Sequence, residues 1–164
     1  MKQLLIIRHA KSDWSNPLLT DFERTLNDRG NKDAPLMAKR LKEKNIAIDT
    51  FVSSTANRAL TTATYFAKAY DKKEKDILQL DELYHASTNI FYTTIESLQN
   101  KINSVALFSH NPGITDFVNS LTKTRIDNMP TCSIFAIKVD IESWASFSQA
   151  KKEFWFFDYP KMGA

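Results

Sequence analysis

Two of the three histidines in the chain directly follow short apolar segments. His9 comes after residues 4–7 with Arg8 between them, and His110 comes after the apolar segment 104–108 with Ser109 between them. An arginine at the end of a buried strand needs an anion beside it, either from the protein or from a ligand. An imidazole nitrogen can attack phosphorus, and cations can neutralise the oxygens of a phosphoryl group. These residue types therefore indicate phosphoryl transfer.

Arg58 supplies a second cation for the same chemistry. It lies in the segment 53–59 (SSTANRA), in the first turn of a predicted helix. The free amides of a helix N-terminus and a guanidinium group both favour phosphate. The alternative is a surface arginine paired with Asp49 or Asp81, because charged helix residues are usually solvated.

The elements that would position these residues alternate between strand and helix. Strands are predicted over 3–8, 50–53, 104–108, 133–139 and 153–158, with a further strand near 143–148; helices are predicted over 28–44, 56–70, 88–101 and 113–121. The alternation favours an α/β fold of three layers, α/β/α, with a mainly parallel central sheet. Ligands bind beyond the carboxyl ends of such strands, so Arg8-His9, Ser53-Ser54 and Ser109-His110 should meet in one crevice.

The bulk properties exclude several classes of protein. A length of 164 residues suggests a single domain over 1–164, and 22 basic against 19 acidic residues is too balanced to indicate a nucleic-acid partner. One cysteine cannot form an internal disulfide, so a cytoplasmic location is expected. The first apolar run is too short for a signal sequence or a membrane span. Neither spaced metal ligands nor a glycine-rich nucleotide loop is present, so we expect no metal and no cofactor.

Several segments together resemble the histidine phosphatase superfamily, whose fold is called phosphoglycerate-mutase-like. The resemblance lies in residues 5–12 (LIIRHAKS), 24–30 (RTLNDRG), 53–63 (SSTANRALTTA) and 109–113 (SHNPG). The last segment, together with 82–84 (ELY) and 129–131 (MPT), is similar to the small SixA-type phosphohistidine phosphatases. Position 10 is alanine where the superfamily signature has glycine.

The resemblance implies a role for each of four residues. His9 would be the nucleophile and would become phosphohistidine. Arg8, Arg58 and His110 would bind the phosphoryl group and stabilise its transition state, and water would then hydrolyse the intermediate.

Four other polar residues have less defined roles. Cleavage of a phosphoester needs an acid to protonate the leaving oxygen, and Glu82 is the nearest candidate by order, although a solvated loop carboxylate is an equal interpretation. SixA-type proteins lack a dedicated acid, and phosphohistidine has a better leaving group. Ser12 could contact the phosphate, and His85 is expected at the pocket rim or in a structural role, with a proton shuttle as the alternative. Arg24 is expected to join the long loop to the first helix, with a role in the pocket as the less favoured alternative.

The leading hypothesis is a metal-independent SixA-type phosphatase that removes phosphate from phosphohistidine in a protein. The alternatives are a small-molecule phosphomonoesterase, in which Glu82 acts as the acid, and a non-catalytic phosphate-binding module. A mutase is disfavoured because the chain is too short for substrate-enclosing insertions. The expected partner is a phosphorylated protein or a small phosphorylated molecule, with no nucleic acid and no membrane, and the expected state is a monomer. The aromatic segment 154–157 is expected to be a strand buried on both faces.

Overall fold

Six strands form one sheet with the order β3-β2-β4-β1-β5-β6 in the computed structural model, which describes residues 1–162. The strands are β1 (Lys2–Arg8), β2 (Thr50–Ser54), β3 (Ile77–Leu80), β4 (Ser104–Ser109), β5 (Ile134–Val139) and β6 (Lys152–Asp158). The four strands from β3 to β1 pair in parallel, whereas β5 pairs antiparallel with both β1 and β6. The predicted mainly parallel sheet is therefore confirmed, with an antiparallel extension at one side.

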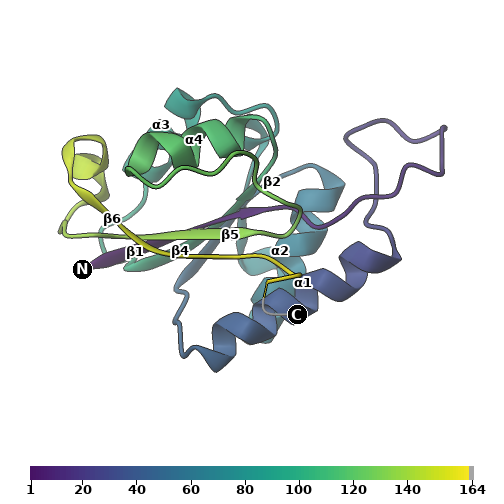
Figure 1. The fold of residues 1–164 in the computed structure, drawn as a ribbon, viewed down its shortest axis with the longest axis horizontal. Helices are drawn as coiled ribbons and strands as arrows, with labels where there is room; N and C mark the ends of the chain where they lie inside the picture. Colours follow the sequence, from purple (N-terminus) through teal and green to yellow (C-terminus); the bar gives the residue numbers. More distant parts are fainter. Residues whose placement is uncertain (163–164) are drawn as a thin grey trace.

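Helices cover both faces of the sheet, as Figure 1 shows. The helices α1 (Asp28–Glu43) and α2 (Asn57–Ala69) lie against one face, and α3 (Thr88–Glu96) and α4 (Gly113–Leu121) lie against the other. The predicted three-layer architecture is confirmed, although α3 ends five residues before the predicted boundary at residue 101. None of the helices within residues 1–162 is both long and apolar enough to cross a membrane.

Two local predictions were wrong. The segment near 143–148 is not a strand but a 3-10 helix, η3 (Trp144–Gln149), which begins where the Ser143 side chain accepts a hydrogen bond from the Ala145 amide. Trp144 and Phe147 are three residues apart, so one helical turn buries both, which a strand could not do. The aromatic segment 154–157 is a strand, as predicted, but it is not buried on both faces. It belongs to the edge strand β6, where Phe154 remains 36% exposed.

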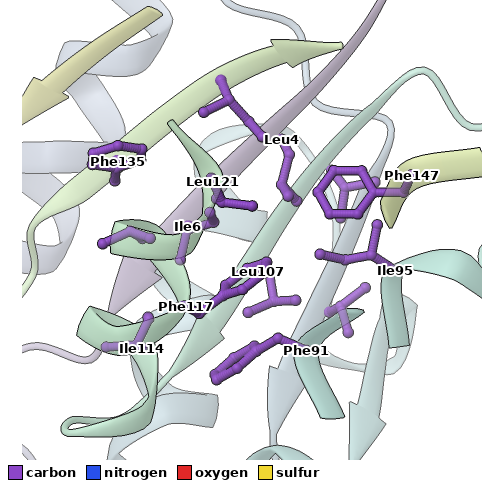
Figure 2. Close-up of a cluster of buried hydrophobic side chains, with 14 of the residues drawn as sticks. Leu4, Ile6, Phe91, Ile95, Leu107, Ile114, Phe117, Leu121, Phe135 and Phe147 are labelled. Atoms are coloured by element: carbon purple, nitrogen blue, oxygen red, sulfur yellow. The ribbon is translucent and has the colours of Figure 1, made fainter. Parts of the chain in front are cut away.

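The strand β1 explains the run of four apolar residues at positions 4–7. Successive side chains of a strand point to opposite faces, so Leu4 and Ile6 enter the cluster beneath α3 and α4, as Figure 2 shows. Leu5 and Ile7 enter the second cluster, beneath α1 and α2. Because β1 is buried on both faces, it fixes the position of the residues that follow it.

The register of the parallel strands sets their ends at one edge of the sheet. Arg8, at the end of β1, lies beside Ser109 of β4, and Ser53 of β2 lies beside Phe108. The loop 9–27 leaves β1 at this edge and extends beyond the sheet before it returns to α1 (Figure 1).

Gly30 lets the loop after β1 pack against the first turn of α1. The Asn27 side chain caps this helix by accepting a hydrogen bond from the Gly30 amide (2.8 Å), and the Asn27 amide donates to the Lys11 carbonyl (3.0 Å). A Cβ atom at position 30 would lie 2.2 Å from the Lys11 carbonyl oxygen. The absence of a side chain at this position therefore permits the close approach.

We expect Gly30→Ala to destabilise the protein by about 1–3 kcal/mol, because the added methyl would displace the backbone of Lys11. The sign of the change in the free energy of unfolding distinguishes the two cases, because the same substitution in an unconstrained helix stabilises the helix by up to ~1 kcal/mol. Urea unfolding measures the effect, with the exposed Lys32→Ala on the same helix as control. A stability equal to or above that of the parent would contradict this packing.

Candidate active site

A cleft of about 520 Å³ lies at the edge where β1, β2 and β4 end. It brings together seven residues that the sequence analysis names: Arg8, His9, Ser12, Arg24, Arg58, His85 and His110. The ends of β1 and β4 therefore meet at the cleft, as expected. The second strand contributes Ser54, which contacts His110 behind the cleft wall.

The backbone of His9 is held from both sides. Its amide donates to the Ser109 carbonyl (3.2 Å), and its carbonyl accepts from the Cys132 amide (3.0 Å). The ring Nδ1 lies 2.7 Å from the Ala10 carbonyl, and because a carbonyl can only accept, Nδ1 carries the hydrogen. The lone pair of the neutral ring is therefore on Nε2, which has no hydrogen-bond partner within residues 1–162.

His110 lies beside His9, with ring centroids 5.1 Å apart. Its Nε2 is 2.8 Å from Ser54 Oγ, which also accepts a hydrogen bond from the Ala56 amide. The Ser54 hydroxyl can donate its hydrogen to Nε2, and this leaves Nδ1 of His110 as a donor. That Nδ1 is buried and has no partner among the described residues, so it is available to an acceptor in the cleft.

Three guanidinium groups border the same cleft. Arg8 donates to the Met129 carbonyl (2.8 Å), Arg58 donates to the Asp21 carbonyl (2.6 Å), and Arg24 donates to the Ser12 hydroxyl. In the described part of the chain, the Nε atom of each of these arginines is buried without a hydrogen-bond partner. Buried donors of this kind are normally satisfied, so their grouping indicates an anion site.

Asp21 is the one carboxylate that borders the cleft within residues 1–162. It accepts a hydrogen bond from the Tyr84 hydroxyl and forms ion pairs with Arg24 (3.0 Å) and Arg58 (3.1 Å). The Tyr84 hydrogen bond, followed by the two arginines, holds the pKa of Asp21 well below its ordinary value. Asp21 therefore stays ionised and orients the two guanidinium groups.

Burial and the arginines together keep the two histidines neutral. Burial lowers the pKa of His9 to about 3, and the charges of Arg8, Arg58 and Arg24 add to this, although the Ala10 carbonyl opposes it. Burial also lowers the pKa of His110 far below its ordinary value, and His9 and Arg58 contribute to the shift. A neutral imidazole retains the lone pair that nucleophilic attack requires. No three histidine, cysteine or acidic side chains are grouped as a metal site requires in residues 1–162.

Arg58 borders the cleft as the sequence predicted, but the first helix amides, which were expected to face the same site, have other partners. It is 6% exposed and pairs with Asp21, not with Asp49 or Asp81. The amides of Ala56 and Asn57 at the start of α2 already donate to Ser54 Oγ and the Phe22 carbonyl. The contribution of α2 to the cleft is therefore the guanidinium group and not those two helix amides.

Glu82 does not border the cleft. It lies in η2 (Asp81–Leu83), is exposed, and faces a separate hollow lined by Leu78 and Leu80. The order of the residues suggested it as an acid, but the buried residue of this turn is Leu83, whose carbonyl accepts from the Ser109 hydroxyl (2.6 Å). The geometry of Glu82 thus agrees with the alternative of a solvated carboxylate.

Three residues of the cleft were not predicted from the sequence, and a pocket role for Arg24 was only the less favoured alternative. Asp21 and Tyr84 form the hydrogen-bond network, Trp14 stacks on Arg24 at 3.5 Å from its guanidinium carbon, and Arg24 borders the cleft in addition to joining the loop to α1. Arg24 and Tyr84 stand in segments that carried the family resemblance, which was the available signal. Asp21 and Trp14 lie in a polar loop without a distinguishing pattern. His85 lies at the rim, as expected, with its ring 4.0 Å from that of Tyr84.

Comparisons with known proteins give one family and one fold. The sequence profile of the histidine phosphatase superfamily (branch 1) matches residues 4–87. An uncharacterised protein of Mycobacterium leprae is 27% identical over 125 residues, which cover 74% of each chain. A structure from Agrobacterium tumefaciens, assigned as a phosphohistidine phosphatase SixA, has a TM-score of 0.82 at 24% identity and covers 97% of this chain and 98% of that one. The protein histidine phosphatase SixA complexed with tungstate has a TM-score of 0.78 at 23% identity, with 96% and 97% covered.

The buried neutral histidines predict a loss of stability in acid. Unfolded histidines gain a proton near pH 6.5, whereas His9 stays neutral until about pH 3, so the unfolded state binds more protons between these values. The free energy of unfolding should be greatest above pH 6.5 and should fall by roughly 2 kcal/mol per histidine at pH 5.

Urea unfolding at several pH values measures this dependence, and ring nitrogen NMR shifts identify the histidine. The variants His9→Asn and His110→Asn should each remove part of the slope. Inorganic phosphate should move the titration of His9 upward, because a dianion favours the imidazolium form. A His9 ring that titrates near pH 6.5 without phosphate would be inconsistent with its burial.

Proposed function

Because the chain belongs to branch 1 of the histidine phosphatase superfamily, we propose that it is a phosphatase that carries the phosphoryl group on His9 and removes it from phosphohistidine in a protein. One observation carries the proposal: the free Nε2 of a neutral His9 opens into a cleft bordered by three arginines and the unpartnered Nδ1 of His110.

The first step is the transfer of the phosphoryl group to His9. The guanidinium groups of Arg8 and Arg58 and the Nδ1–H of His110 bind the phosphoryl oxygens and stabilise the charge that spreads over them in the transition state. The Nε2 lone pair of His9 forms the new bond to phosphorus, while the bond from phosphorus to the leaving nitrogen breaks. The lone pair of His9 is available for this because the ring is not protonated at neutral pH.

The second step is hydrolysis of the intermediate. The Nδ1–H of His9 remains hydrogen-bonded to the Ala10 carbonyl, so the phosphorylated ring carries a positive charge. Such a ring leaves as neutral imidazole when water attacks phosphorus. The bond to Ala10 therefore favours both steps, since it directs attack through Nε2 and makes His9 a good leaving group.

A protein substrate is supported by the loop beside the cleft. Trp14, Leu18 and Phe22 are large apolar residues of this loop, exposed by 76%, 90% and 39%. Trp14 borders the cleft itself, and Phe22 packs its ring edge on Tyr84 at 5.1 Å. Apolar side chains gathered beside a binding site favour contact with another protein surface.

Neither alternative function has comparable support. The small-molecule phosphomonoesterase was predicted with Glu82 as the acid, and Glu82 faces a different hollow. The exposed apolar residues of the loop 9–27 favour a protein substrate over a small molecule. A non-catalytic phosphate-binding module would not need a free and neutral imidazole nitrogen at the anion site. The tungstate bound by a structural relative is a tetrahedral oxyanion, which agrees with a phosphoryl site in this fold.

We expect His9 to gain one phosphate after brief exposure to phosphoramidate, a small P–N donor, and His9→Gln to gain none. Mass spectrometry after a rapid quench without acid detects the intermediate, because phosphohistidine is labile in acid. His9→Gln should also release no inorganic phosphate. Phosphate found on His85 or His110 instead, or none in the wild type, would contradict the covalent role of His9.

We expect Leu18→Ser to lower kcat/KM about tenfold for a phosphohistidine-bearing protein, because the lost apolar contact corresponds to a change of about 1.4 kcal/mol. Hydrolysis of phosphoramidate should not change. Leu36→Ser, at a residue of α1 with 41% exposure outside the cleft, is the matched control. Equal effects of Leu18→Ser on both substrates would argue against protein docking at this loop.

A further inference from the structure

A second hollow of about 590 Å³ adjoins the cleft and shares Tyr84, His85 and His110 with it. The hollow lies between the segment 84–89 and the beginning of α4, and it contains Asn89 and Asp116, which do not border the cleft. His9 and the arginines, in turn, do not border the hollow. The two cavities therefore separate a side that binds the phosphoryl group from a side that is open to the rest of a substrate.

The leaving group has to depart toward this junction. In phosphoryl transfer the attacking atom, phosphorus and the leaving atom lie roughly in line. His9 is buried in the inner wall, and attack from there directs the leaving atom outward. A proton donor for the leaving group should therefore border both cavities.

Three titratable side chains border both cavities within residues 1–162: Tyr84, His85 and His110. Tyr84 donates its hydroxyl hydrogen to Asp21, and burial and that bond raise its pKa. His110 is bonded to Ser54, and burial lowers its pKa, so the ring is neutral and its single hydrogen, on Nδ1, is directed to a phosphoryl oxygen. His85 is exposed, and its ring is stacked on that of Tyr84.

We propose that His85 gives the proton to the leaving group and takes one back from the attacking water, a role that rests on the proposed function. With a phosphohistidine substrate, His85 protonates the ring nitrogen that does not carry phosphorus. The P–N bond then breaks, and its electron pair stays on the leaving ring, which departs as neutral imidazole. In the second step water forms the P–O bond, His9 keeps the electrons of its P–N bond, and the released proton returns to His85.

The surroundings of His85 suit a group that exchanges protons with solvent. Three titratable residues line the hollow together with His85: Tyr84, which precedes it in the chain, His110, which follows β4, and Asp116 of α4. Asp21 and the cationic side chains Lys11, Arg8, Arg24 and Arg58 border the shared cleft. Imidazole is the side chain that ordinarily gives and takes protons near neutrality.

The test is a series of aryl phosphates, from p-nitrophenyl to unsubstituted phenyl phosphate, because the latter leaving group needs a proton far more. We expect His85→Gln to lower kcat/KM about 10²-fold or more for phenyl phosphate and to change it little for p-nitrophenyl phosphate. The alkaline fall of the pH profile for phenyl phosphate should disappear. Added imidazole should restore activity to His85→Ala.

Two further variants separate proton transfer from structure. His85→Phe keeps a ring on Tyr84 but cannot give a proton, so it should resemble His85→Gln. Glu82→Gln, in the neighbouring turn, should behave as wild type. A loss that is equal for all leaving groups, or His85→Gln with wild-type kinetics, would overturn the role of His85 while phosphorylation of His9 stands. A wild type that hydrolyses none of the substrates and forms no phosphohistidine would overturn the proposed function together with it.

Discussion

Three guanidinium groups share one cleft with two neutral imidazole rings and one carboxylate, and the other features of the site follow from this arrangement. Cations in a poorly hydrated space repel one another unless each is fixed and partly neutralised. The Met129 carbonyl fixes Arg8, and Asp21 fixes Arg24 and Arg58. The remaining positive charge favours a dianion and disfavours protonation of His9, so one electrostatic cause supports both binding and nucleophilicity.

The sheet holds this arrangement through backbone contacts. Parallel strands β1 and β4 end side by side, and the bonds of His9 to Ser109 and Cys132 fix its backbone between β4 and the segment that leads into β5. The Thr62 hydroxyl accepts from the Ala10 amide (3.0 Å) and donates to the Arg58 carbonyl (2.8 Å), which couples α2 to the loop after His9. Alanine at position 10 is therefore compatible with a closely packed loop, and it is fully buried.

The cleft has an inner wall and an outer rim with different chemistry. The inner wall is buried, cationic and fixed by hydrogen bonds, as phosphoryl binding requires. The rim carries the exposed Trp14 of the loop 9–27 and the polar residue His85, which also borders the hollow that contains Asp116. In the proposed function, a substrate larger than its phosphoryl group contacts this rim, so the rim would select among substrates while the inner wall would carry out the reaction.

Periodicity in the sequence predicted the layers and the strands that end at the cleft, because periodicity encodes burial. The distinctive family segments pointed to Arg8, His9, Arg58 and His110, all of which border the cleft. They also indicated the superfamily, which the profile match confirms. The prediction of a strand near 143–148 was wrong because a short apolar segment fits both the three-residue spacing of a helical turn and the two-residue spacing of a strand. The pairing of Asp21 with two arginines and the orientation of Glu82 away from the cleft became evident from the folded chain alone. Those outcomes depend on the path of the loop 9–27 and on a single turn at η2, and local patterns do not encode which distant side chains such segments meet.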